Sequence, residues 1–369
     1  IQLLSESVKS KISAGEVVEG PFSVVKELVE NPLDAGATRV EVHAGMSGLK
    51  RISVSDNGHG ILRDDAALAL RDHATSKIGD VHDIEGITTY GFRGEALSSI
   101  SSISEVTLLT RHASEELGAR VQGREGSVEF SDYAGPAGTT VIVENLFFNV
   151  PARKKFLKSP QTEMRYIRET FIKMALANPA VHFSLESDGK KTLNFPAAKD
   201  IRDRLRQVYG NEVYEGCYFE ELADIRVRIS GMLSKPDCLK ASRTMQQLFI
   251  NGRPVEYRYL GFLLSRAYEA VALHGKYPVG ILFMEIDPAL VDVNIHPAKR
   301  EVKLFDGRYI DSLILQLANK ALNRIHSMDS LPFSSAESVN ERQSFHSATQ
   351  FPHGPVFMER ETLPPGEKS

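Results

Sequence analysis

A polar, glycine-rich turn follows a predicted strand over residues 51–54, and its side chains suit a flat ligand that bears an amine. Asp56 stands at the end of this strand, where its carboxylate can accept a hydrogen bond from an exocyclic amine. Gly58 and Gly60 lack a Cβ and let the backbone approach such a ligand closely. An Asp-Asn-Gly turn without any ligand is also common, so this segment alone does not decide between the two interpretations.

A second segment suited to binding holds a glycine pair ahead of a predicted helix. Gly91 and Gly94 precede that helix, whose exposed N–H groups form a site for anions. Thr75, Ser76 and Lys77 lie upstream and add two hydroxyls and a cation. The chain has no GxxxxGK[ST] phosphate loop. Taken alone, the glycine pair is explained better by a flexible loop that ends in an ordinary helix cap.

Two further segments hold polar residues that a site could use. Glu27, Asn31 and Asp34 are spaced i, i+4 and i+7, so they share one face of a helix predicted to begin at Pro21. On this run alone, the solvated face of an amphipathic helix is the favoured interpretation. Thr139 follows a glycine at the entry to a strand, where an ordinary strand start is the default.

The elements that must position these residues alternate between helix and strand. Stretches of alternating polar and apolar residues predict strands, and proline is well suited to the first turn of a helix. In the first half we expect helices over 21–36, 64–72 and 94–100 and strands over 39–43, 51–54, 106–109, 119–121 and 139–143. In the second half we expect helices over 200–209 and 308–326 and strands over 226–232, 247–251 and 280–286. The pattern indicates an α/β fold.

Length and composition indicate two domains and a tail. A chain of 369 residues is too long for one ordinary domain. We expect the first domain over 1–200 and the second over 201–326. Residues 327–369 are rich in proline and serine without a sustained apolar period, which predicts a flexible linker or tail. Because the first residue is Ile1, we expect an incomplete N-terminus, and we expect a further domain beyond the tail.

Charge and cysteine content exclude several classes of protein. The chain has 44 Lys and Arg residues against 48 Asp and Glu residues, so a bulk polycation is excluded and any nucleic acid must bind a local basic face. The two cysteines have no CxxC spacing, which argues against a zinc site and a disulfide scaffold and favours a reducing compartment. No apolar run reaches about 18 residues, so we expect no membrane span and a cytoplasmic location.

One local stretch, residues 151–173, is strongly basic. It holds seven basic residues against two acidic ones, a net charge of +5 that contrasts with −4 for the whole chain. Such a stretch suits contacts to DNA phosphates through Arg153, Lys154 and Lys155, and a solvated helix explains it equally well. Arg253 is a second candidate for DNA contact. No motif for reading bases is visible, so we expect binding that is largely independent of DNA sequence.

Taken in order, these segments resemble the ATPase motifs shared by gyrase B, the ninety-kilodalton heat-shock chaperone, sensor histidine kinases and MutL. Within this group, the residues of these segments are much more similar to those of the MutL family of DNA mismatch repair proteins. Six runs carry this resemblance: ISAGEVVE (12–19), SVVKELVEN (23–31), HATSKI (73–78), GFRGEAL (91–97), NLFFNVPARKKFL (145–157) and VDVNIHPAKREV (291–302). The resemblance covers roughly residues 1 to 325 and implies a two-layer α/β sandwich of the Bergerat type. It also implies a second α/β domain that is similar to the transducer domain of gyrase B.

The resemblance implies a role for each matching residue. Glu27 matches the general base that activates the attacking water, and Asn31 matches the ligand of Mg²⁺. Asp56 matches the residue that reads the adenine amine, and Gly58 and Gly60 match the glycines that let adenine lie close. Seven residues match the lid that contacts the phosphates: Thr75, Ser76, Lys77, Gly91, Phe92, Arg93 and Gly94.

Two more matches extend the implied site. Thr139 matches the threonine behind the adenine-reading aspartate. Lys299 matches a lysine that reaches the γ-phosphate from the second domain, although a solvated turn beside Pro297 would also explain it. If Lys299 binds the γ-phosphate, ATP would lock the two domains together.

The chain departs from the family pattern at two positions. Pro32 stands where a small residue such as serine is usual, and a proline inside a helix costs about 3 kcal/mol because a donor is lost and the ring clashes with the carbonyl four residues back. That carbonyl belongs to Leu28, so Pro32 could kink the helix and shift Asn31. Gly20 stands where a basic residue is common. The departures leave an alternative open: a non-hydrolysing adaptor that binds DNA and partners, with its metal site impaired by Pro32.

The main hypothesis is a bacterial MutL-type mismatch repair protein that binds and slowly hydrolyses ATP with Mg²⁺. In that family ATP binding drives two copies together as a homodimer. The resemblance implies as partners DNA, a mismatch-recognition protein of the MutS type and a downstream nuclease or helicase, with no membrane partner. The C-terminal dimerisation region of such a protein would fall outside this chain.

Overall fold

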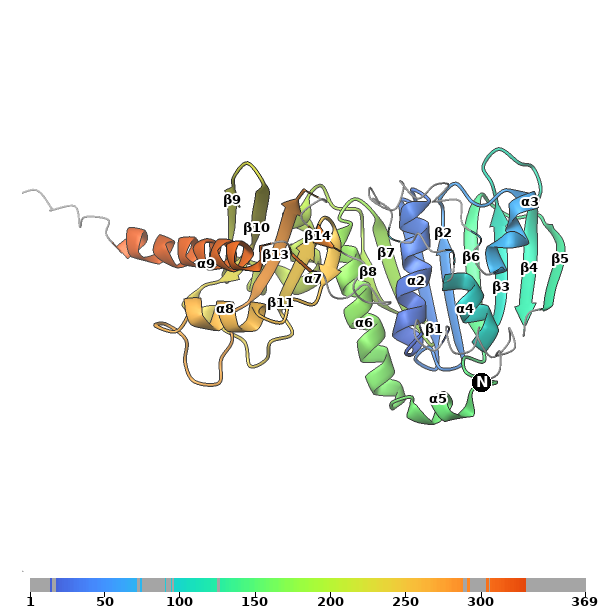
Figure 1. The fold of residues 1–369 in the computed structure, drawn as a ribbon, viewed down its shortest axis with the longest axis horizontal. Coiled ribbons are helices and arrows are strands. Elements are labelled where there is room, and N and C mark those ends of the chain that lie inside the picture. The colour runs from blue at the N-terminus through green and yellow to red at the C-terminus, as the bar shows by residue number, and fades with distance from the viewer. Residues whose placement is uncertain are drawn as a thin grey trace, which may run out of the picture. The chain divides into compact units, whose positions relative to one another are not determined.

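The structure is a computed structural model that describes residues 14, 18–71, 74, 90, 94, 96–124, 127–287, 291–292, 303–304 and 306–329. The chain divides into two units, Ile1–Met328 and Asp329–Ser369, and the description below concerns the first. Figure 1 shows its helices and strands. Within the described ranges, no helix combines the length and the apolar character needed to cross a membrane.

An eight-stranded sheet forms the first part of the chain. Its strand order is β5-β4-β3-β6-β2-β1-β7-β8, and neighbouring strands are antiparallel except for the parallel pair β1 and β7. The strands are β1 Arg39–Gly45, β2 Arg51–Asp56, β3 Glu105–Arg111, β4 Gly118–Arg124, β5 Ser127–Tyr133, β6 Gly138–Glu144, β7 His182–Ser187 and β8 Lys190–Phe195.

Helices cover one face of this sheet (Figure 1). α2 (Pro21–Asp34) packs on β1 and β2, α4 (Ala96–Ile103) packs on β3 and β4, and α6 (Pro160–Ala177) packs on β7. The strands bury alternate side chains under these helices: in β3, Val106 and Leu108 are buried and their neighbours are half-buried. One sheet under one layer of helices is a two-layer α/β sandwich, which confirms the predicted fold class.

Shorter elements complete this part. Between β2 and α4 lie α3 (Arg63–Ala66) and a 3-10 turn over Leu68–Leu70, where a single helix over 64–72 was predicted. α5 (Pro151–Phe156) leads into α6, whose first turn is capped by Ser159. Ser159 caps α6 by accepting a hydrogen bond from the backbone N–H of Thr162. The basic stretch over 151–173 therefore lies on two helices, α5 and the first part of α6.

A five-stranded sheet forms the second part, in the order β12-β11-β13-β10-β9. Only β11 and β13 are parallel, and α8 (Leu260–Ala267) lies between them in the chain. The strands are β9 Cys217–Ala223, β10 Val227–Ser234, β11 Gln246–Ile250, β12 Arg253–Val255 and β13 Gly280–Ile286. A 3-10 turn over Pro236–Cys238 follows β10, and the pair β14 (Val291–Asp292) and β15 (Lys303–Leu304) follows β13.

Alternation along these strands buries both faces of the second sheet. In β11, Leu248 and Ile250 join a core with residues of α8 and α9 (Gly307–Asp329). Phe249 points the other way and joins a core with α6 and α7 (Ile201–Glu215). The second part is therefore an α/β arrangement with helices on both faces, in agreement with the predicted second α/β domain.

A buried arginine anchors α7 to the first sheet. The Arg204 side chain is fully buried, and its guanidinium donates hydrogen bonds to the backbone carbonyls of Phe195, Pro179 and Val181. Burial lowers the pKa of Arg204 to about 10. The predicted domain boundary near residue 200 lies between the last strand of the first sheet and Cys217, the first residue of the second sheet, and stays a prediction.

Candidate active site

The three polar residues of α2 lie on a partly enclosed face of the helix. Glu27, Asn31 and Asp34 are all half-buried, whereas the solvated face considered above would leave them exposed. The opposite stripe of α2, which includes Val25, Leu28 and Val29, is buried in the core. The structure therefore brings Glu27 and Asn31 together in a partly desolvated setting.

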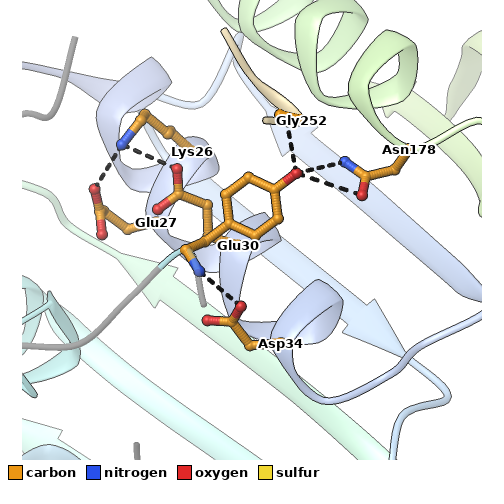
Figure 2. Close-up of polar contacts among 7 residues, drawn as sticks. Lys26, Glu27, Glu30, Asp34, Asn178 and Gly252 are labelled. Carbon is orange, nitrogen blue, oxygen red and sulfur yellow. Dashed lines mark hydrogen bonds and ion pairs between the residues drawn. The ribbon is translucent and has the colours of Figure 1, made fainter. Parts of the chain in front are cut away.

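Lys26 holds the Glu27 carboxylate in place. Its Nζ lies 3.1 Å from Oε1 of Glu27 and 3.1 Å from Oε1 of Glu30. Figure 2 shows Lys26 between these two carboxylates. Burial lowers the pKa of Lys26, but both carboxylates raise it, and together they leave it above the ordinary value. The ammonium is therefore charged at neutral pH. Sequence reasoning gave Lys26 no role, although the i, i+4 spacing from Lys26 to Glu30 on a predicted helix was a usable signal.

Asp56 ends β2 with its carboxylate held by backbone donors. The N–H of Gly58 donates to Oδ1 of Asp56 at 2.8 Å, and the N–H of Thr139 donates to the same carboxylate. Burial raises the pKa of Asp56, and these hydrogen bonds lower it by less. A half-buried carboxylate at a strand end is a suitable acceptor for an amine. The structure thus brings Asp56, Gly58 and Thr139 together.

Thr110 supports this corner, and sequence reasoning missed it. Its buried hydroxyl accepts a hydrogen bond from the N–H of Ile61 at 2.9 Å and lies 3.0 Å from the hydroxyl of Thr139. Thr110 therefore connects β3 and β6 to the turn after Asp56. The pairing of β3 with β6 is not local, so no sequence pattern pointed to this contact.

Both candidate glycines pack against the protein's own backbone. Gly60 has φ +76°, and a Cβ there would lie 2.1 Å from the carbonyl oxygen of Arg111. A Cβ on Gly58 would lie 2.9 Å from the carbonyl oxygen of Ala35. The fold thus has its own reason for glycine at both positions, and contact with adenine remains a prediction.

Tyr90 connects α2 to the second sheet. Its backbone N–H donates to Oδ1 of Asp34 at 2.8 Å, and its hydroxyl donates to the carbonyl of Gly252 at 2.9 Å. The amide of Asn178, just after α6, also bonds to this hydroxyl (Figure 2). The guanidinium of Arg253 lies over the Tyr90 ring, 5.7 Å from its centre. Sequence reasoning gave Tyr90 no role, because a single tyrosine before a glycine-rich run carries no sign of distant partners.

Several predicted site residues lie outside the described residues: Thr75, Ser76, Lys77, Gly91, Phe92, Arg93 and Lys299. Gly94 is described and has φ +64°, a conformation that favours glycine. β14 and β15 pair on either side of the segment that contains Lys299. The proposed lid and the γ-phosphate lysine therefore remain predictions.

The predicted DNA-contacting residues differ in their surroundings. Lys154 and Lys155 are exposed on α5. Arg153 is half-buried, donates to the carbonyl of Val18 at 2.7 Å and lies over the Phe147 ring, so it has a structural role as well. Arg253 is the residue over Tyr90. Lys154 and Lys155 are thus the better candidates for phosphate contact.

Pro32 lies inside α2, as the third residue from its end. It is buried, the helix continues to Asp34, and the carbonyl of Pro32 accepts a hydrogen bond from the N–H of Ala37 at 2.9 Å. A residue with an N–H at position 32 could donate to the carbonyl of Leu28, which proline cannot do.

We expect Pro32→Ser to raise the melting temperature by a few degrees and to raise Mg²⁺-dependent ATP turnover. The restored hydrogen bond contributes about 1 kcal/mol, which corresponds to about 2–4 °C in a domain of this size. Pro32→Ala is the matched variant, because it restores the N–H without adding a hydroxyl. Thermal melts and steady-state turnover on the three proteins measure the effect. Unchanged values for both variants would mean that Pro32 does not damage the helix.

The donor groups near α2 suit Mg²⁺ bound together with a nucleotide. Among the described residues, no three His, Cys, Asp or Glu side chains form a group that could hold a metal ion. Mg²⁺ needs no such cage, since it commonly takes one or two protein oxygens, several waters and substrate phosphates. Half-buried Asn31 has an amide oxygen that could supply one such ligand, so the residues present fit this mode of binding.

Two family descriptions match the chain. "Histidine kinase-, DNA gyrase B-, and HSP90-like ATPase" matches residues 19–127, which include α2, the Asp56 turn and β3. "DNA mismatch repair protein, C-terminal domain" matches residues 205–323, which include the second sheet. The first description and the two-layer sandwich define an ATPase of the Bergerat type.

Similar proteins show which family within this class the chain belongs to. A DNA mismatch repair protein MutL of Opitutus terrae is 42% identical over 326 residues, with 88% of this chain and 52% of that protein covered. The MutL ATPase domain of Aquifex aeolicus, solved with ADP, is 30% identical with a TM-score of 0.57, and the match covers 82% of this chain and 98% of that one. The N-terminal domain of a DNA repair protein is 28% identical with a TM-score of 0.76, over 88% of this chain and 99% of that one. The chain belongs to the MutL family of DNA mismatch repair proteins.

The chain spans about half the length of the curated relatives that it matches. The match covers 52% of the Opitutus terrae protein and 55% of the MutL of Cellvibrio japonicus, which is 39% identical to this chain.

Proposed function

We propose that this chain binds ATP with Mg²⁺, hydrolyses it with Glu27 as the general base, and uses the nucleotide state as a dimerisation switch in mismatch repair. The observation that carries the proposal is the placement of Glu27 and Asn31 on one half-buried face of α2, which packs on β2, the strand that ends at Asp56. This arrangement puts a base, a metal ligand and an amine acceptor on two neighbouring elements.

Each of these residues has a distinct part in the proposal. The Asp56 carboxylate accepts a hydrogen bond from the adenine amine and so orients the base. The Glu27 carboxylate, held beside Lys26, takes a proton from the water that attacks the γ-phosphorus, and the bond to the β,γ-bridging oxygen breaks. Asn31 contributes an amide oxygen to Mg²⁺, which when bound neutralises charge on the phosphate oxygens.

A steady-state ATPase assay with purified chain tests the proposal. Turnover that requires Mg²⁺ supports it, whereas nucleotide binding without turnover supports the alternative of a non-hydrolysing adaptor with a metal site impaired by Pro32. The assay should be repeated at several protein concentrations, because turnover that depends on dimerisation rises with concentration.

The basic surface of α5 supports DNA binding. Lys154 and Lys155 are exposed side by side, and no base-reading motif accompanies them, so we propose contacts to phosphates that do not depend on sequence. By extension, we propose a mismatch-recognition protein of the MutS type and a downstream nuclease or helicase as partners, since the chain belongs to a mismatch repair family.

We expect the double charge reversal Lys154→Glu, Lys155→Glu to weaken DNA binding about equally for all sequences. Each lost phosphate contact reduces the slope of log K against log salt by about 0.9, so the slope should fall by about 1.8. Titrations with labelled duplexes at four salt concentrations measure this slope. Lys190→Glu, Lys191→Glu is the matched control, because these two lysines are exposed on β8, away from α5. An unchanged slope for the α5 variant would place the DNA site elsewhere.

Tyr90 offers a route from the proposed nucleotide site to the second sheet, since it bonds to Asp34 of α2 and to Gly252. We expect Tyr90→Phe to lower kcat by about fivefold with little change in KM, because it removes a hydrogen bond worth about 1 kcal/mol and keeps the ring under Arg253. Tyr257→Phe is the matched control, since the Tyr257 hydroxyl donates to Asp311 within the second part. Equal kcat values for Tyr90→Phe and wild type would argue against this route.

A further inference from the structure

A cavity of about 480 Å³ lies between α2, α5, α6 and β12. The residues that line it come from Glu19 to Lys26, Phe156 to Met174 and Pro254 to Glu256. The proposed nucleotide-site residues Glu27, Asn31 and Asp56 do not line this cavity. Its volume falls in the range of pockets that hold small molecules or single side chains.

The buried carboxylate of Glu163, on the wall of the cavity, has a hydrogen-bond partner on only one of its two oxygens among the described residues. The Glu163 residue is only 3% exposed, and Oε1 accepts a hydrogen bond from the backbone N–H of Lys158 at 2.8 Å. Oε2 has no hydrogen-bond partner among the residues that the structure describes. A buried charge without a partner is costly, so a cation that reaches Oε2 would be bound favourably.

The remaining wall also favours a cation. Four carboxylates and three ammonium groups line the cavity, a net charge of −1. One of the three ammonium groups, that of Lys26, is already paired with Glu27 and Glu30. Phe22 adds an aromatic surface, packed edge-on against Tyr166 with ring centres 5.7 Å apart.

These features fit a guanidinium group better than an ammonium group. A guanidinium is flat, donates five N–H groups toward several carboxylates and is more weakly hydrated, so it tolerates burial and stacks on aromatic rings. The backbone at Gly20 adds room beside Glu163: a Cβ there would lie 3.5 Å from Oε2 of Glu163, an ordinary contact distance. A side chain longer than glycine at position 20 would therefore start next to the unpartnered oxygen.

We propose that this cavity is a binding site for the guanidinium group of arginine, with Glu163 as its counter-ion. A free arginine and an arginine side chain of a peptide share this chemistry. The site is separate from the proposed ATPase function and stands without it.

The test is thermal stabilisation by N-acetyl-arginine amide. At ten times the dissociation constant, the ligand should raise the melting temperature of the wild-type chain by at least about 2 °C. The citrulline analogue has the same shape without the charge, and it should give no shift. Free arginine and the tripeptide Gly-Arg-Gly, run in parallel, distinguish a free ligand from a peptide-borne side chain.

Two pairs of variants control the test. Glu163→Gln should lose the arginine shift and melt no lower than wild type, because it replaces a buried carboxylate that has only one partnered oxygen and Gln can still accept from the N–H of Lys158. Glu169→Gln, which is also on the wall but exposed, should keep the shift. Gly20→Arg should raise the melting temperature and abolish the ligand shift, whereas Gly20→Gln should not raise it to the same degree.

Two results would overturn the proposal. Equal arginine shifts for wild type and Glu163→Gln, or no shift in wild type, would show that Glu163 holds no guanidinium. A clear loss of stability in Glu163→Gln would show that an internal lysine, such as Lys158 or Lys173, already pairs with Glu163 in solution.

Discussion

Replacing Glu27 with alanine should reduce ATP turnover by about 100-fold or more while nucleotide affinity stays within a few-fold of wild type. The reason is that Glu27 is proposed to act only on the attacking water. Adenine recognition is assigned to Asp56 and metal binding to Asn31, and neither depends on the Glu27 carboxylate. Single-turnover hydrolysis and equilibrium binding of a non-hydrolysable ATP analogue measure the two quantities separately.

The ion pairs of Lys26 make a control necessary. Glu27→Ala removes one of the two carboxylates that neutralise this ammonium, so part of any effect could come from a displaced Lys26. Glu30→Gln removes the other carboxylate and leaves Glu27 in place. If Glu30→Gln reduces turnover as much as Glu27→Ala, or if Glu27→Ala also loses nucleotide affinity, Glu27 is structural and the general base lies elsewhere.

The elements that sequence reasoning found are those with a strong local pattern. β13 was predicted over 280–286 and has those bounds, because it holds an apolar run over 281–284 whose residues are buried or half-buried on both faces. The last helix was predicted over 308–326 and runs over Gly307–Asp329, since its apolar residues recur with helical spacing. These elements depend on burial patterns that can be counted along the chain.

Several elements were missed, and β5 and α6 show two different reasons. β5 is an edge strand of the first sheet, in which Val128 and Phe130 alternate with polar residues but no residue is buried. Its hydrogen bonds with β4 hold it in the sheet. The segment of α6 was interpreted as a basic DNA-contacting stretch or a solvated helix, although Ile167, Phe171 and Met174 form a buried stripe in it. The prediction for this segment used its basic residues and did not use the helical spacing of its apolar residues.

For the candidate site, spacing identified residues on single elements, and contacts between elements remained hidden. The shared face of Glu27 and Asn31 could be read from the sequence, as could the end of β2 at Asp56. The contact of Tyr90 with Asp34, 56 residues away, could not be read in this way. Neither could Oε2 of Glu163, which has no hydrogen-bond partner among the residues that the structure describes. Such contacts depend on how distant segments meet, which periodicity does not report.

Replacing Asn31 with alanine should remove the Mg²⁺ dependence of nucleotide binding. In the presence of Mg²⁺, affinity for the ATP analogue should fall by about tenfold or more, to the value that wild type shows in EDTA. Asn31 is half-buried in the last turn of α2, and its backbone carbonyl accepts a hydrogen bond from Ala35 at 3.0 Å. Alanine keeps this bond and is a better helix former than asparagine, so the helix should be preserved.

Asn31→Asp distinguishes the loss of an oxygen ligand from the loss of the asparagine side chain's size and shape. Aspartate has nearly the same size and supplies an oxygen that Mg²⁺ prefers, so this variant should keep the Mg²⁺ dependence that alanine loses. Titrations with Mg²⁺ and with EDTA on both variants decide the matter. Full metal dependence in Asn31→Ala would place the metal ligand on another residue. It would also remove the reason to connect Pro32 with the metal site, because Pro32 is proposed to act by shifting Asn31.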